Sequence, residues 1–259
     1  MIGWIELQSI PLITLVIFAS CYALTAIIIA AVTFVSRRAI GEDLKMFSPV
    51  TLTPLAVILG LLIAFLAARV WDNVGRARDY IGQEAGALSR ALLFADSLPA
   101  DVRAKVRSAV KEHVEFVVQH DWPEMAVMNA DPREEPVGLR RMVTALLSFT
   151  PVQADQQLAQ KSALAAIEQA FQARRNRIRL SRTEISPIQW DVILVLFTLI
   201  MLTTAMIHIG KPAAMAAALI IFSTAIASCV TLLMVNDRPF AAGGVTMTPL
   251  EFRQIIALD

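Results

Sequence analysis

The sequence is poor in several features that particular functions require. It has only two cysteines, Cys21 and Cys229, and both lie inside apolar runs, so a disulfide framework and a cysteine metal site are excluded. It contains neither a phosphate-binding glycine loop nor a Gly-x-Ser-x-Gly motif. His113 and His120 are seven residues apart, roughly 10 Å along a helix, which is too far to share one metal ion. We therefore expect no enzyme activity, no cofactor and no metal.

Charge is balanced, and apolar residues dominate. The 23 basic and 22 acidic side chains leave a net charge of +1, which gives no argument for nucleic-acid binding. Hydrophobic residues make up 56% of the 259 positions, which is more than an ordinary globular domain contains. Most of the charged side chains fall between the second and third of four long apolar runs. This distribution is typical of a membrane protein that carries a water-facing domain.

Four charge-free runs are long enough to cross a bilayer, whose hydrocarbon core of about 30 Å needs about 20 helical residues. They cover about 11–35, 46–68, 192–210 and 212–236. The first run is too long for a signal peptide and no basic region precedes it, so we expect it to be retained. The sequence predicts an all-α membrane protein with four transmembrane helices and the lipid bilayer as its surroundings.

The lysines and arginines near the ends of the runs predict the orientation. They are more numerous on the side that holds the termini and the long middle segment, which places both in the cytoplasm, although Arg37 and Arg38 in the first loop argue the other way. The predicted domains are two transmembrane spans, a cytosolic helical domain, two more spans and a cytosolic C-terminal segment. Their ranges are 1–72, 73–186, 187–236 and 237–259.

The middle segment has helical periodicity throughout. Residues 101–118 place an apolar stripe along one face of a helix, and residues 151–182 contain one proline, at the start, and no glycine. Between them, the proline-rich residues 129–138 predict a loop. Pro123, directly after Trp122, predicts the end of a helix. No run alternates apolar and polar residues as a strand would.

The second apolar run continues into the charged segment without a stop signal. No proline stands between Pro54 and Pro99, and the glycines are isolated. This predicts one helix of about 45 residues, roughly 65 Å long at 1.5 Å per residue. Such a helix cannot bury its apolar stripe alone, so we expect it to pack against its neighbours and against other subunits.

Three stretches of the sequence resemble a known family. "LTPLAVILGLLIAFLAARVWDNVGRARDYIGQEAGALSR" is similar to the second transmembrane helix of the bestrophins and its cytosolic extension, and "NDRPFAAGGVTMTPL" is similar to the segment after their fourth span. "HDWPEM", together with "DRPF", is closer to the bestrophin-like family of bacterial and plant membrane proteins. The resemblance runs from residue 50 to about 250. It implies a homo-oligomer, a pentamer, in the inner membrane of a bacterial cell.

Bestrophins are ion channels whose second helix lines the pore, and this resemblance implies the same role for small inorganic ions here. The match puts Thr53, Val57 and Leu61 at the narrow neck. They lie four residues apart on one helix face, where five apolar side chains around an axis can gate by excluding water. The alternative is that Val57 and Leu61 face lipid or pack between helices.

Two departures from the family limit what carries over. Calcium-gated bestrophins have an acidic run after the fourth span, whereas here only Asn236 and Asp237 precede Arg238, so we expect no calcium site. The neck aromatics of animal members are absent. Selectivity inferred from them therefore does not transfer.

Charged residues offer two further hypotheses. Three arginines near the cytosolic pore mouth, Arg69, Arg76 and Arg78, favour anions if they face the axis. Asp72 and Asp79 lie beside them, so whether the pore prefers anions or cations stays open. A basic run is expected to contact anionic lipid headgroups or else only to set the topology. Its members are Arg174, Arg175, Arg177, Arg179 and Arg182.

The leading hypothesis is a homopentameric channel of bestrophin-like build, with anions such as chloride slightly favoured and the pore lined by the second transmembrane helix. One alternative is a monovalent-cation channel of the same build. The other is a non-conducting membrane scaffold or sensor that acts through its cytosolic helices. A secondary transporter is disfavoured because we find neither internal repeats nor broken spans with polar centres.

Overall fold

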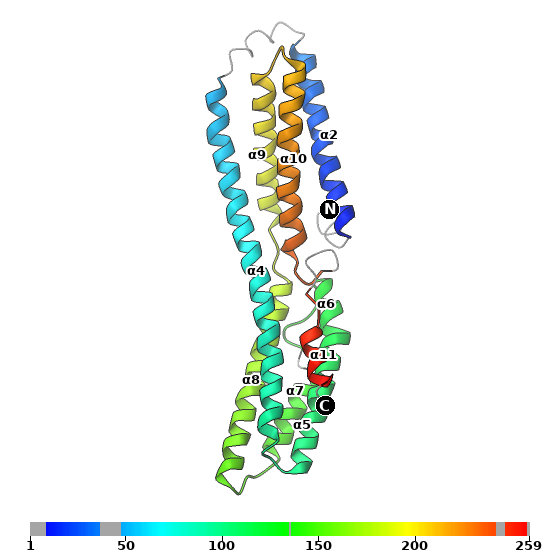
Figure 1. Ribbon diagram of the computed structural model, residues 1–259, viewed down its shortest axis with the longest axis vertical. Coiled ribbons are helices and arrows are strands. Elements are labelled where there is room, and N and C mark those ends of the chain that lie inside the picture. Colours follow the sequence, from blue (N-terminus) through cyan, green and yellow to red (C-terminus); the bar gives the residue numbers. More distant parts are fainter. Residues whose placement is uncertain (1–8, 37–47, 135, 242–246, 258–259) are drawn as a thin grey trace. The chain divides into compact units, whose positions relative to one another are not determined.

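The computed structural model describes residues 9–36, 48–134, 136–241 and 247–257, and every element within these ranges is helical (Figure 1). The expected all-α class is therefore confirmed. The first loop, with Arg37 and Arg38, lies outside the described residues. In chain order the elements are α2 (Ile10–Ser36), η1 (Pro49–Thr51), α4 (Leu52–Ala95), α5 (Ala100–Phe116), η2 (Val117–Asp121), α6 (Trp122–Ala126), α7 (Val137–Leu147), α8 (Ala154–Ser181), α9 (Pro187–Ile207), α10 (Pro212–Asp237) and α11 (Leu250–Ala257).

The chain forms two compact units. The described residues within Met1–Asp72 and Glu184–Asp237 make up unit 1, and those within Asn73–Thr183 and Arg238–Asp259 make up unit 2. Four helices are long and apolar enough to cross a membrane, namely α2, α4, α9 and α10, which confirms the four expected spans. The apolar part of α4 belongs to unit 1, and the rest of this helix belongs to unit 2.

In unit 1, α10 packs against both α2 and α9. The contact with α2 includes two hydroxyl pairs, Thr25 with Ser223 at 2.5 Å and Tyr22 with Thr224 at 2.9 Å. Each hydroxyl thereby gains a partner inside an apolar environment, where an unpaired one would be costly. At the end of α10, the buried carboxylate of Asp237 accepts the backbone N–H of Ile185, which fixes the entry to α9.

The third span begins earlier than its charge-free run. The Ser186 side chain caps the first turn of α9, the Gln189 side chain reaches back to the Ser186 N–H, and Pro187 occupies the first turn. The capping box gives hydrogen-bond partners to N–H groups that a helix start leaves unpaired, and the proline has no N–H group that would need one. Asp191 is therefore part of the helix rather than a residue that precedes it.

The helix α4 is 44 residues long and confirms the expected helix of about 45 residues. The η1 turn precedes it, with the Ser48 side chain accepting the Val50 N–H. After α4, the chain turns and reaches Pro99, whose ring disfavours helical backbone at the residue before it. Nothing between these two ends breaks the ladder of backbone hydrogen bonds.

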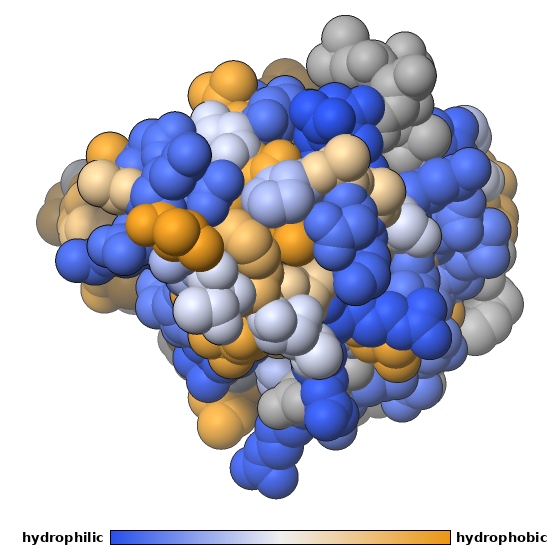
Figure 2. Space-filling view, turned by 90° about the horizontal axis from the view of Figure 1, so that it is seen from below, coloured by the Kyte–Doolittle hydropathy of each residue, from blue (hydrophilic) through white to orange (hydrophobic). Residues whose placement is uncertain are grey.

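In unit 2, the helix α5 buries the apolar stripe that its periodicity predicts, namely Val102, Val106, Ala109, Val110 and Val114. The helix α7 packs closely on it at Gly138, where an added Cβ would lie 2.6 Å from His113 N and 2.7 Å from Ala109 O. Glycine therefore allows the two backbones to approach. Figure 2 looks onto the end of unit 2 and shows mostly hydrophilic residues, with separate hydrophobic ones among them.

The expected helix end at Pro123 is wrong. The chain remains helical from α5 through the π-helical turn η2 into α6, with Pro123 in the first turn of α6. A proline clashes with the carbonyl four residues earlier in an α-helix, and a π-helical turn widens the backbone locally. The helix therefore continues past Pro123, and Asp121, in the wide turn, is buried in the interior of unit 2.

Candidate functional site

One face of α4 in unit 1 is uncovered in the single chain. Leu59, Leu66 and Val70 are buried against the other spans, whereas Thr53, Val57 and Leu61 are exposed, the last two at 53% each. Only 11% of the apolar 18-residue stretch of this helix is buried, whereas 44% of the corresponding stretch of α9 is buried. Figure 1 shows this part of α4 at one side of the other three spans. The predicted neck residues therefore lie together on an apolar surface that other molecules can cover.

Near the end of this part of α4, Asp72 and Arg69 lie at different angles around the helix axis. Eleven residues are close to three full helical turns, so Asp72 lies only about 20° around the axis from Leu61, whereas Arg69 lies about 80° away. The Arg69 guanidinium is 3.5 Å from both Gln189 Oε1 and the Glu184 carbonyl oxygen, which draws it toward the start of α9. Asp72 is thus closer than Arg69 to the face of the predicted neck.

Arg76 and Arg78 belong to unit 2, and both side chains are exposed. They are two residues apart, so a helix places them about 200° apart and they cannot both face one axis. The three predicted mouth arginines therefore do not form a single ring of charge.

The five arginines of the basic run do not share one environment. Arg174 and Arg177 are buried inside unit 2, at 1% and 0% exposure, and are bonded to carboxylates there. The side chains of Arg175, Arg179 and Arg182 reach the surface. Headgroup contact remains a proposal for these three, since the two buried guanidiniums are already occupied by protein acceptors.

A buried ion network lies at the centre of unit 2. Arg174 donates from Nε and Nη2 to the two carboxylate oxygens of Asp121, both at 2.8 Å. Arg177 donates to Glu84 from Nε at 2.8 Å and from Nη2 at 3.2 Å, and Nη2 also lies 3.2 Å from Asp121. Two guanidiniums thus face two carboxylates. Buried charges are tolerated only when they are paired in this way.

His113 completes the network. Its Nε2 lies 3.1 Å from Glu84 Oε1, and because an ionised carboxylate only accepts, Nε2 carries the proton that is shared with it. The other ring nitrogen, Nδ1, is buried and has no hydrogen-bond partner among the described residues. His113 is therefore tied to the network through Nε2 alone.

Two carboxylates keep Arg177 charged, and two aromatic rings pack against its guanidinium. The guanidinium carbon lies 5.4 Å from the ring centres of both Trp122 and Phe252. Burial by itself lowers the pKa of Arg177, but the facing carboxylates of Glu84 and Asp121 outweigh it and hold this pKa above its ordinary value. The stabilisation that Arg177 provides is therefore present at all physiological pH values and would be lost only as the pH rose through that raised pKa.

Two of the short motifs noted in the sequence meet in unit 2. The ring of Trp122, from "HDWPEM", packs edge to face on Phe240, from "DRPF", with ring centres 5.7 Å apart. The Trp122 Nε1–H donates to the Met247 carbonyl oxygen at 3.1 Å. The motifs therefore build one structural centre, in which Asp121 holds the arginines and Trp122 holds the C-terminal segment.

Sequence reasoning missed Glu84, His113 and Asp121 as members of this network. For Glu84 a signal was available, because it stands at helical spacing between Ile81 and Leu88 on the buried stripe of α4. A signal was available for His113, because it follows Val106, Ala109 and Val110 at helical spacing and so belongs to the apolar stripe of α5. Asp121 also continues the apolar stripe, since it follows Val114 and Val117 at helical spacing, but a stripe does not show that a carboxylate on it is paired.

The chain matches a family model and several solved structures. The model of the Bestrophin-like domain matches residues 19–249. A crystal structure of a bacterial bestrophin homologue from Klebsiella pneumoniae is similar in fold, with a TM-score of 0.69 at 12% identity, covering 93% of this chain and 95% of that chain. Two variants of the Klebsiella pneumoniae bestrophin homologue are also similar, each at 12% identity. One has a TM-score of 0.71 and covers 93% of this chain and 96% of that chain. The other has a TM-score of 0.72 and covers 95% of this chain and 99% of that chain. No curated protein matches the sequence.

Proposed function

Because the chain belongs to the bestrophin-like family, we propose that it assembles as a homopentamer in the bacterial inner membrane and conducts small ions through a pore lined by α4. The observation that supports this most is the uncovered row of Thr53, Val57 and Leu61 on the least buried of the four spans. Five copies of this row around an axis would cover one another and leave a narrow apolar passage. Such a passage controls ion flow through the cost of dehydration.

Both termini and unit 2 lie in the cytoplasm in this proposal. The hydrophilic end of unit 2 in Figure 2 indicates that this unit faces water, and the excess of arginines at the ends of the spans supports the cytoplasmic side. The uncharged neck leaves the choice of ion to the charged residues beyond it. The proposed slight preference for anions such as chloride rests on the number of arginines near the cytosolic end of the pore helix, not on a ring of them.

A monovalent-cation pore of the same build is a second candidate, and one observation favours it. Asp72 lies closer than Arg69 to the face of the neck residues, and the Arg69 guanidinium turns toward Gln189 and Glu184. A ring of five aspartates would attract cations. The reversal potential in a gradient of KCl decides between the two ions.

Recording from purified protein in planar bilayers tests the pore. Leu61→Ala widens an apolar neck and should raise the single-channel conductance at least about twofold, since ions then lose less of their hydration shell. Leu194→Ala is the matched control, because Leu194 is 56% exposed on α9 and lies outside the proposed neck. No conductance in any tested salt, or equal effects of the two substitutions, would remove this assignment of the neck.

The particle size tests the assembly. Native mass spectrometry in detergent should give five copies, and images down the symmetry axis should show fivefold symmetry around a central hole. A monomer or a dimer would instead favour the third candidate, a membrane scaffold or sensor that acts through its cytosolic helices.

A further inference from the structure

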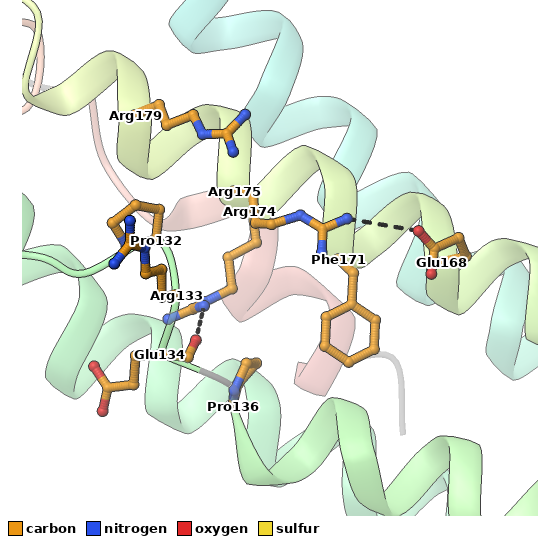
Figure 3. Close-up of a pocket in the computed structure, with 9 residues that line it drawn as sticks. All are labelled: Pro132, Arg133, Glu134, Pro136, Glu168, Phe171, Arg174, Arg175 and Arg179. Carbon is orange, nitrogen blue, oxygen red and sulfur yellow. Dashed lines mark hydrogen bonds and ion pairs between the residues drawn. The ribbon is translucent and has the colours of Figure 1, made fainter.

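Unit 2 contains a cavity between the helix α8 and the loop residues Pro132, Arg133, Glu134 and Pro136. Its volume is about 560 Å³, which lies within the usual range of small-ligand sites. Figure 3 shows guanidinium groups on several sides of it, with the ring of Phe171 and the ring of Pro136 on another side. The residues that line it belong to unit 2, whereas the residues of the proposed neck belong to unit 1.

Cationic groups dominate the lining. Arg133 and Arg179 form no ion pair with any other side chain in the described part of the chain. Arg175 pairs with Glu168 at 3.6 Å, and both of these side chains remain accessible to solvent, so a competing anion can replace the pair. The Glu134 side chain extends away from Phe171 (Figure 3) and lies 4.0 Å from His120 Nδ1.

The buried network holds the floor of the cavity in place. Arg174 donates from Nη1 to the Glu134 carbonyl oxygen at 2.6 Å while its other nitrogens hold Asp121. The loop is therefore tied to α8 before any ligand arrives. Pro132 and Pro136 restrict the backbone of the loop further. A site whose geometry exists beforehand binds with a smaller entropic cost.

We propose that this cavity binds a phosphate group carried by a small molecule. The guanidiniums of Arg133, Arg175 and Arg179 would contact the phosphate oxygens, since arginine presents paired N–H groups that match them. The ring of Phe171 would contact an apolar or planar part of the same molecule. The phosphate belongs either to a soluble metabolite or to a lipid headgroup, and both sources use the same arginines.

Calorimetric titration of the full-length protein in detergent tests the site. Phenyl phosphate should bind saturably, because it supplies a phosphate and a planar ring. Its affinity should exceed that of inorganic phosphate, which has a similar charge but no ring, if Phe171 contributes, and it should fall as salt is added. No measurable binding of phenyl phosphate, inorganic phosphate or a short-chain phosphatidylglycerol would overturn the proposal.

Substitutions locate the site. In the double variant Arg133→Gln and Arg179→Gln, the affinity for phenyl phosphate should fall at least about tenfold, since two charge-assisted contacts are lost. Arg253→Gln removes an exposed arginine from α11 and should leave the affinity unchanged. Equal affinities of the double variant and the wild type, with an unchanged unfolding temperature, would overturn the assignment of these residues.

The two sources of phosphate give different results. For a soluble ligand, phenyl phosphate binds and short-chain phosphatidylglycerol does not displace it. For a lipid, phosphatidylglycerol binds more tightly than phenyl phosphate and competes with it, and the double variant loses that binding. In either case the arginines are the residues that recognise the phosphate.

Discussion

Arg177 packs against the adjacent rings of Trp122 and Phe252 and faces the carboxylates of Glu84 and Asp121, without contact with water. The Arg177 guanidinium is sensitive to the loss of one carboxylate, because in this buried site no water can take the place of that carboxylate. A buried pair adds little net stability compared with apolar residues of the same size, but removing one member leaves an uncompensated charge. The network therefore specifies one arrangement of unit 2.

The substitution Glu84→Gln tests this network. It removes the charge that faces Arg177 in a site with no solvent exposure, and we expect a loss of about 3 kcal/mol and an apparent unfolding temperature roughly 10 °C lower. Thermal unfolding of the full chain in detergent measures it. Glu112→Gln is the control: Glu112 pairs with Arg141 at 2.9 Å on the surface, where a pair contributes less than about 1 kcal/mol. Similar temperature shifts for the two variants would contradict the account.

Selectivity also has a residue-scale test. If Asp72 faces the pore, Asp72→Asn should shift the reversal potential in a KCl gradient toward that of chloride, because the ring of negative charge is lost. Arg69→Gln should shift it less, since the Arg69 guanidinium lies near Gln189 and Glu184. A larger effect of Arg69→Gln would place the arginine at the pore instead.

Individual buried charges were the hardest feature to predict from the sequence. Arg174 and Arg177 stand in a run of arginines that has the composition of a membrane-surface segment. They follow Ile167 and Ala170 at helical spacing on the buried face of α8, but spacing alone does not show that a charged side chain on this face is paired. Their burial depends on acceptors contributed by α4 and η2, which are distant in the sequence. Only the tertiary arrangement brings those acceptors together.

At the scale of elements, hydrophobic periodicity was sufficient for most of the fold. The stripe on α5, the long helix α4 and the four spans follow from the 3.6-residue period, the absence of proline and the length that a bilayer requires. The helical continuation past Pro123 did not follow. It depends on a π-helical turn, which no residue pattern in the sequence marks.

The contact between α5 and α7 gives an element-scale prediction. Gly138→Ala places a methyl group against backbone atoms of α5 that cannot move aside, and we expect a destabilisation of about 1–3 kcal/mol. Gly75→Ala is the control, since no atom lies within 4 Å of its added Cβ, and it should stabilise α4 by about 0.5–1 kcal/mol. Thermal unfolding of both variants measures the difference. An unchanged Gly138→Ala variant would show that the two helices have room to separate.

At the scale of the whole molecule, neither the sequence nor one chain specifies the number of subunits. What the chain does contain is an apolar row on α4 that its own helices leave uncovered. Lipid or identical copies can cover it. The choice between them depends on the shape of a surface that exists only after assembly, which is why periodicity could not predict it.

The orientation gives a whole-molecule prediction. With the termini in the cytoplasm, a green fluorescent protein fused after the last residue should fluoresce, and alkaline phosphatase fused there should be inactive, because each enzyme or fluorophore matures on only one side of the inner membrane. Alkaline phosphatase inserted after Gly41, between the first two spans, should be active. The reverse pattern would invert the topology derived from the arginine distribution.

The pairing of Arg177 with Glu84 and of Arg174 with Asp121 has an evolutionary consequence. A substitution that removes the charge at one of these four positions leaves the opposite charge buried and unpaired. Mutations there should therefore be inherited in compensating pairs. Descendants of this chain that exchange Glu84 for an apolar residue are therefore expected to have exchanged Arg177 as well, while the neighbouring surface arginines drift independently.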